Sequence, residues 1–232
     1  MKPLFLSLIL GASLLSCSSP YEVTPVFTKI NEKTQDYEIA GTTLKLESSS
    51  EKVIRQIAPL NERLTNLSDS LVRSTKTQAV DFFTEYNRDL EAGKIEFPRP
   101  AFQYNLYLTD SMFVASEKII SIQVTAYVFS GGAHGNTFFY SQNFSPEKGV
   151  FYATGDILDL NKEDEINALL MKNFRNPADC FDQKPTLKLA TTINVTAQSV
   201  VFTYAHYVLG AYACGFVTVE VPIAELKGIF KL

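Results

Sequence analysis

Two stretches near the start of the chain alternate between apolar and polar residues, a period of two that predicts β-strands. They cover residues 21–30 and 36–46, and the polar segment 31–35 between them predicts a turn. Over residues 53–90 apolar side chains recur at every third or fourth position, which predicts one long amphipathic helix. Because Pro59 suits a first helical turn better than a helix interior, we expect the regular part of this helix to begin there.

The alternating pattern returns at residue 101 and continues close to the C-terminus. Residues 161–175 interrupt it with acidic residues at the start and basic residues at the end, which predicts a shorter helix, and 224–230 predict a short terminal helix. Strands without regular βαβ alternation indicate an α+β fold, with antiparallel sheets packed against one long helix and one shorter helix. We assign 21–130 to an N-terminal α+β region and 131–232 to a C-terminal one, as two packed halves or one compact domain.

The N-terminus has the form of a bacterial lipoprotein signal. Lys2 precedes an apolar run, Leu4–Leu15, that is too short to span a bilayer and leads to Cys17. We expect residues 1–16 to be cleaved, Cys17 to be acylated, and residues 17–20 to form its tether. The protein would then be anchored to the envelope outside the cytoplasm, on the periplasmic face of the outer membrane in a Gram-negative cell. The alternative is an ordinary secretory signal that leaves a free thiol.

Composition and cysteine count narrow the class further. The chain is 46% hydrophobic and 20% charged, which is typical of a globular protein with a core. Its formal net charge is −4 and no cluster of Lys and Arg is present, so nucleic acid is not an expected partner. Lipidation of Cys17 would leave Cys180 and Cys214 as a pair in an oxidising compartment, which favours a disulfide over two separate buried thiols.

The common catalytic motifs are absent from the sequence. It contains no P-loop, dinucleotide fingerprint, HExxH or GxSxG motif, and its two histidines are His134 and His206. No metal-ligand spacing is present, so we expect neither a metal nor another cofactor. Acidic residues gather in the segment 156–165, where the dipole of a following helix explains most of them. We assign no catalytic residue and favour a protein that is not an enzyme.

Two segments nevertheless supply candidate binding residues. The loop 131–136 reads Gly-Gly-Ala-His-Gly-Asn, and three glycines indicate unusual backbone angles or close approach. His134 and Asn136 could present polar atoms to a ligand, or His134 could satisfy the backbone of a tight strand connection. The tyrosines in 204–215 suit an aromatic contact patch or half-buried sheet positions. The candidate binding residues are therefore Gly131, Gly132, His134, Asn136, Tyr204, Tyr207 and Tyr212.

The same segments carry a family resemblance. The loop GGAHGN after a strand, the segment TGDILDL at 154–160, and VVFTYAHYVLGAYACGFVTVEVPIAELKGIF at 200–230 resemble the C-terminal domain of the PdaC/RsiV-like family. The upstream region 21–130 resembles the partner domain that usually precedes it. The family includes the ectodomain of a lysozyme-sensing anti-sigma factor. The resemblance implies an extracytoplasmic α+β module, with lysozyme binding in one branch and peptidoglycan deacetylation in another.

The sequence also departs from that family. It has no sigma-binding segment, no transmembrane helix and no deacetylase metal motif, so neither the anti-sigma role nor the deacetylase activity is carried over. We therefore expect a non-catalytic, lipid-anchored envelope module that binds a lysozyme-like muramidase or peptidoglycan. One alternative is a peptidoglycan-acting hydrolase that uses His134 with an acidic residue. The other is a structural envelope lipoprotein.

Overall fold

A computed structural model describes residues 21–232. The predicted cleavable signal and Cys17, the predicted lipidation site, lie outside these residues. The helices are α1 (Glu51–Glu91), α2 (Thr154–Ile157) and α3 (Glu163–Asn173), with short 3₁₀ turns that include η3 (Leu187–Leu189) and η4 (Tyr212–Cys214). The strands are β1 (Thr24–Lys33), β2 (Tyr37–Glu47), β3 (Tyr104–Ala115), β4 (Ile120–Phe129), β5 (Asn136–Ser145), β6 (Val150–Phe151), β7 (Thr192–Val195), β8 (Ser199–Tyr204) and β9 (Val217–Pro222).

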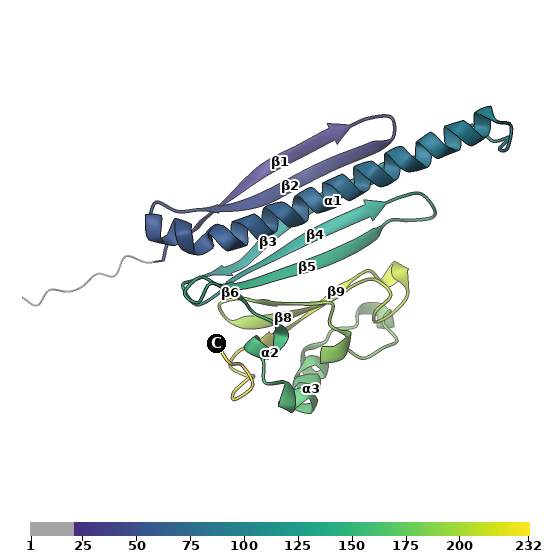
Figure 1. Ribbon diagram of the computed structural model, residues 1–232. Helices are drawn as coiled ribbons and strands as arrows, with labels where there is room; N and C mark the ends of the chain where they lie inside the picture. Colours follow the sequence, from purple (N-terminus) through teal and green to yellow (C-terminus); the bar gives the residue numbers. More distant parts are fainter. Residues whose placement is uncertain (1–20) are drawn as a thin grey trace, which may run out of the picture.

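These elements stack in four layers (Figure 1). Helix α1 lies on one face of a six-stranded sheet of order β1-β2-β3-β4-β5-β6, and the three-stranded sheet β7-β8-β9 packs against β4 and β5. Helix α3 covers β9 on the far side. The predicted α+β class, with one long and one shorter helix, is confirmed. Within residues 21–232 no helix is long and apolar enough to cross a membrane.

Helix α1 follows the predicted apolar period but begins earlier than predicted. Its first turns bury Val53 and Ile57 in a cluster with strand residues such as Leu46. The expectation that the helix begins at Pro59 is wrong, because the helix already begins at Glu51 and contains the proline. Pro59 is exposed, so the carbonyl that loses its hydrogen-bond donor can be hydrated, and burial of the preceding apolar residues stabilises the turns before it.

The C-terminal segment is the second departure from the predicted elements. Residues 224–230, predicted as a short helix, form turns in which Leu226 N–H donates to the carbonyl of Ile223 and Ile229 N–H to that of Leu226. Gly228 has φ 71°, a left-handed conformation that interrupts a right-handed helix. The predicted helix at 224–230 is therefore wrong.

All neighbouring strands are antiparallel except β2 and β3, which pair in parallel from Tyr37↔Tyr104 to Gly41↔Leu108. Helix α1 is the crossover that returns the chain for this parallel pair. The β4–β5 hairpin contains position 131, and β5 and β6 remain in the larger sheet. The predicted regions 21–130 and 131–232 therefore share this sheet, and the division between them stays a prediction.

Beyond Gly41 strand β2 separates from β3, and side chains take over as hydrogen-bond partners of its backbone. The N–H of Leu44 donates to the carboxylate of Asp110. The N–H of Leu46 donates to Asn61 Oδ1 at 2.8 Å, and Asn61 Nδ2 donates back to the Leu46 carbonyl at 2.8 Å. Because buried backbone groups need partners, β3 and α1 together close the gap that the departing strand leaves.

The buried carboxyl of Asp110 makes stability depend on pH. Burial raises its pKa to about 6, and the hydrogen bond from Leu44 offsets this only in part. An unfolded Asp has a pKa of about 3.9, so the folded state binds the proton more tightly. The protonated carboxyl of Asp110 therefore stabilises the fold by up to about 3 kcal/mol. This contribution is complete below pH 4 and is lost as the pH rises through 6. We expect denaturant unfolding of Asp110→Asn at pH 4 to 7 to lack this loss; identical pH profiles for variant and wild type would contradict the assignment.

A buried polar junction joins the two sheets. Asn194 on β7 donates from Nδ2 to Ser121 Oγ at 3.0 Å and to the carbonyl of Ile122 at 3.1 Å. Ser121 Oγ donates to Asn143 Oδ1 at 2.7 Å, and Asn143 Nδ2 donates to the carbonyl of Ile193 at 2.8 Å. Paired polar groups inside a core fix the register of the elements that carry them. The smaller sheet is therefore held at one position on β4 and β5.

Candidate functional site

The two segments singled out in the sequence meet at one end of the molecule. The β4–β5 hairpin, at the right-hand end of Figure 1, supplies His134, and the connection between β8 and β9 supplies Tyr212. Their rings stack with centroids 3.6 Å apart and an interplanar angle of 13°. The hydroxyl of Tyr212 also donates to the carbonyl of Gly135 at 2.9 Å. Residues almost eighty positions apart thus form one contact.

Further rings extend this stack. His206 lies against Tyr212 with a centroid distance of 4.6 Å, and Phe216 lies 5.9 Å from His206. The hydroxyl of Tyr207 is 3.0 Å from His134 Nε2, within hydrogen-bond distance. Tyr127 on β4 packs its ring against the backbone of Gly135. We call this set the aromatic face; its members are Tyr127, His134, His206, Tyr207, Tyr212 and Phe216.

Each glycine of the 131–136 loop has a local structural reason. Gly131 and Gly132 have φ of 95° and 94°, in the left-handed region where a Cβ is disfavoured. At Gly135 a Cβ would lie 2.5 Å from the ring of Tyr127 and 2.6 Å from the carbonyl oxygen of Val128. The first two glycines therefore shape the turn, and the third allows an aromatic ring to lie on the backbone.

The backbone at Tyr207 is unusual for a residue with a side chain. Its φ is 67°, which non-glycine residues rarely adopt. The side chain is nevertheless 60% exposed, and its hydroxyl lies beside His134. Backbone strain of this kind concentrates at functional positions, and here it directs a large aromatic side chain outward.

A disulfide holds the connection that carries these rings. Cys180 and Cys214 are bonded, with their Cα atoms 5.6 Å apart, so the predicted pairing is confirmed. Cys214 is the last residue of η4, the turn that contains Tyr212. The chain on either side is tied further by a bridge between Phe181 and Gly210. The aromatic face is thereby fixed to the segment that follows α3.

The electrostatics of the stack favour a neutral ring at its inner end. Burial lowers the pKa of His206, and the neighbouring His134 lowers it further. Its Nδ1 is buried and has no hydrogen-bond partner among residues 21–232. A neutral imidazole loses less solvation energy than a cation when it stacks on Tyr212. His206 thus supports the stack as an uncharged aromatic ring.

Two of the candidate binding residues lie away from this face. Tyr204 is buried in the core, and its hydroxyl donates to the carbonyl of Thr186 at 3.1 Å. Asn136 begins β5 and lines a hollow beside α1 with Tyr140. Conversely, three members of the aromatic face are not among the residues predicted from the sequence. They are Tyr127, His206 and Phe216, which carry no local signal beyond ordinary alternation or a single histidine.

Among residues 21–232, no carboxylate is hydrogen-bonded to His134, although one would be expected beside a catalytic base. Its hydrogen bonds go to the Tyr207 hydroxyl and to the Gly135 carbonyl, neither of which is a carboxylate. Within the described part of the chain, no three His, Cys, Asp or Glu side chains are placed to hold a metal ion. The geometry offers stacking surfaces and hydrogen-bonding hydroxyls, which are features of a contact surface.

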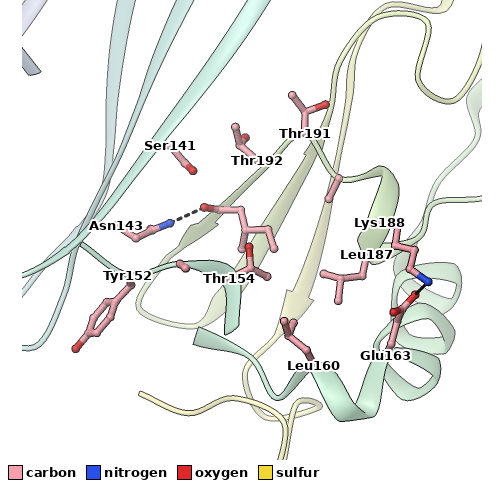
Figure 2. Close-up of a pocket in the computed structure, with 13 residues that line it drawn as sticks. Ser141, Asn143, Tyr152, Thr154, Leu160, Glu163, Leu187, Lys188, Thr191 and Thr192 are labelled. Atoms are coloured by element: carbon pink, nitrogen blue, oxygen red, sulfur yellow. Dashed lines mark hydrogen bonds and ion pairs between the residues drawn. The ribbon is translucent and has the colours of Figure 1, made fainter. Parts of the chain in front are cut away.

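A separate cavity of about 500 Å³ lies between β5, α3 and β7 (Figure 2). Glu163 and Lys188 form an ion pair at one wall, with 3.2 Å between Lys188 Nζ and Glu163 Oε1. None of its residues was among the candidate binding residues, although Thr154 and Leu160 belong to the segment TGDILDL and Glu163 to the acidic segment 156–165. The polar side chains that line it include Ser141, Asn143, Tyr152, Thr154, Glu163 and Lys188.

Comparison with known proteins adds a family match and two similar folds. Residues 26–137 match the family model described as Deacetylase PdaC. No curated protein matches the chain. A DUF3298 family member from Bacteroides fragilis is 14% identical with a TM-score of 0.66, covering 90% of this chain and 93% of that one. A DUF3298 family protein from Pseudomonas aeruginosa is 19% identical with a TM-score of 0.55, covering 91% and 95%.

These findings support the predicted resemblance at a coarser level. The N-terminal match is to the PdaC model, and the two solved structures share the overall fold. The RsiV-like character of the C-terminal part and the identity of the N-terminal part as its usual partner domain stay predictions.

Proposed function

We propose that this protein is a lipid-anchored binding module of the cell envelope that recognises a partner protein through the aromatic face. A lysozyme-like muramidase is the first candidate partner, and peptidoglycan is the alternative. The observation that carries the proposal is an ordered set of exposed rings: Tyr207 is 60% exposed and Phe216 49% exposed. Tyrosine and other aromatic residues dominate the energetics of protein interfaces when they become buried there.

The aromatic face is also pre-organised. The stacked rings of His134 and Tyr212 and the disulfide between Cys180 and Cys214 join three chain segments. A surface that is already ordered loses little conformational entropy on binding, so more of its contact energy becomes affinity.

The position of this face fits an anchored receptor. Tyr21, the first described residue, packs in the cluster of Leu46 and Phe144 at the end of the larger sheet opposite to the β4–β5 hairpin (Figure 1). The 41 residues of α1 run along that sheet, a length of about 60 Å at 1.5 Å per residue. Acylation at Cys17 would therefore leave the aromatic face at the end remote from the membrane.

The family match gives coarser support. Similarity to the PdaC model and to DUF3298 folds suggests a cell-envelope-associated domain. A hydrolase that uses His134 lacks a described carboxylate partner for that histidine. A purely structural lipoprotein would leave the outward direction of Tyr207 unexplained. Recognition of a partner requires no carboxylate beside His134 and gives a role to the outward direction of Tyr207.

We expect Tyr207→Ala and Phe216→Ala each to weaken binding of a purified c-type lysozyme by roughly 30-fold, because a central interface aromatic contributes about 2 kcal/mol. The measurement is isothermal titration of the full-length lipoprotein in detergent. Phe27→Ala is the matched control, since Phe27 on β1 is also 49% exposed but lies at the far edge of the sheet.

The same variants separate the two candidate partners. Sedimentation with purified peptidoglycan that depends on Tyr207 and Phe216, without lysozyme binding, would assign the face to the cell wall. Binding of either partner that is unchanged in both variants would contradict the proposal.

A further inference from the structure

We infer that the cavity in Figure 2 is a second binding site, which takes a neutral, hydroxyl-rich molecule of one or two sugar rings. Its volume of about 500 Å³ lies in the range of small-ligand sites. It shares no lining residue with the aromatic face, so this inference does not rest on the proposed function. Three features of the cavity support it: the rigidity of the walls, the chemistry of the lining and the balance of charge.

The walls of the cavity are fixed by hydrogen bonds between distant elements. Asn143 on β5 donates to the carbonyl of Ile193 on β7 at 2.8 Å and accepts from Ser121 on β4 at 2.7 Å. On the opposite side, the N–H of Leu187 in η3 donates to Asn167 Oδ1 on α3 at 2.7 Å. Sites built on rigid elements hold their polar groups in position before a ligand arrives.

The lining is rich in hydroxyl groups. Ser141 on β5 and Thr154 on α2 direct theirs into the space between the layers (Figure 2). Thr191 and Thr192 line the side nearest β7. The Thr191 hydroxyl accepts from the N–H of Ala205 and the Thr192 hydroxyl donates to Gln123 Oε1, each at 3.0 Å, so each keeps only part of its hydrogen-bonding capacity for a ligand. A hydroxyl both donates and accepts a hydrogen bond, as do the hydroxyls of a sugar, so the two surfaces are chemically matched. The side chain of Leu187 supplies an apolar surface for the C–H face of a sugar ring.

The charges in the cavity compensate one another. Lys188 Nζ and Glu163 Oε1 are 3.2 Å apart, so the positive group already has an anionic partner. An anion such as phosphate needs an unpaired cation or several directed N–H donors. A neutral polyol can instead donate to the carboxylate and accept from the ammonium without separating them. The balance therefore favours an uncharged ligand.

The cavity also gives a role to a segment that the aromatic face does not use. TGDILDL, one of the segments that carry the family resemblance, contributes its first and last residues, Thr154 and Leu160, to the lining. Its interior residues Ile157 and Leu158 are buried in the core of the smaller sheet. The buried middle of the segment therefore holds its two end residues in place at the cavity.

Isothermal titration of the full-length protein with cellobiose and with N,N′-diacetylchitobiose tests the inference, in a detergent without a sugar headgroup. We expect at least one disaccharide to bind and inorganic phosphate not to bind. The double variant Glu163→Gln/Lys188→Met should weaken disaccharide binding about 10-fold, a loss of about 1.4 kcal/mol. Ala190→Phe, which fills the cavity, should weaken it at least as much.

The matched control is Lys172→Met/Glu225→Gln, which removes a comparable exposed ion pair of 2.9 Å outside the cavity. It should bind disaccharide like the wild type, as should Tyr207→Ala. Failure of both disaccharides to bind, preferential binding of phosphate, or undiminished binding by the Glu163/Lys188 variant would overturn the site. The Glu163→Gln/Lys188→Met variant leaves the aromatic face unchanged, so its binding of lysozyme tests only the proposed function. The cavity site and the proposed function can therefore be disproved independently.

Discussion

Replacing both Cys180 and Cys214 by alanine is expected to lower the free energy of unfolding by about 4 kcal/mol and to weaken recognition by the aromatic face. The disulfide joins residues separated by 34 positions, and loop-closure entropy for a ring of this size gives about 4 kcal/mol. The loss of recognition follows from position, because Cys214 ends the turn that carries Tyr212. Without the bond, the turn is free to leave the stack with His134.

Denaturant unfolding of oxidised wild type and the double variant measures the first effect, and titration with c-type lysozyme measures the second. Wild type treated with reductant is the control, and it should match the double variant in both measurements. Cys17 is unchanged throughout, so any effect is separate from anchoring. A double variant as stable as the wild type, with undiminished lysozyme binding, would contradict this account of the disulfide.

A second large effect is expected at Gly41, where Gly41→Ala should lower the free energy of unfolding by about 4 kcal/mol or more. A Cβ there would lie 2.0 Å from the carbonyl oxygen of Leu108 and 2.7 Å from its nitrogen. These are backbone atoms of the paired strand and cannot rotate away. The residue also has φ 123°, which a residue with a side chain rarely adopts. The last parallel pair of β2 and β3 would therefore be forced apart.

Gly149→Ala is the matched control for this substitution. Gly149 also has a positive φ, of 68°, but a Cβ there would meet nothing within 4 Å. Its replacement should cost only the backbone strain, about 1 kcal/mol. Equal destabilisation by the two substitutions, measured by denaturant unfolding, would show that the close approach of Leu108 is not what requires glycine at position 41.

The parts of the fold that were predictable have strong periodicity. Helix α1 repeats its apolar residues for many turns, and β1 and β2 alternate clearly, so their existence followed from the sequence. The start of α1 was not predictable from Pro59 alone. A helix tolerates an interior proline better where the carbonyl that loses its donor faces solvent, and the sequence does not show which face that is. The parallel pairing of β2 with β3 could not be predicted either, because alternation of apolar and polar residues does not indicate whether neighbouring strands run parallel or antiparallel.

The site was predictable in part. Cysteine parity led to the disulfide, which is confirmed. Three glycines drew attention to the loop 131–136, whose backbone angles and close contacts do require them, while its binding role stays a prediction. Tyr204 could not be placed from its neighbours. Every residue of β8 is buried, because β8 lies inside a sheet covered on both faces. The stacking of His134 on Tyr212 also required tertiary structure, since it joins residues far apart in the chain.

In the proposed function, a protein partner covers the aromatic face, which lies at the end remote from the predicted lipid anchor. Amide hydrogen exchange of the full-length protein, with and without bound c-type lysozyme, tests it most directly. We expect slower exchange in 131–136 and 205–216 when lysozyme is bound, with exchange in α1 unchanged. Protection confined to α1 or to the walls of the cavity, with none in the hairpin loop, would contradict it.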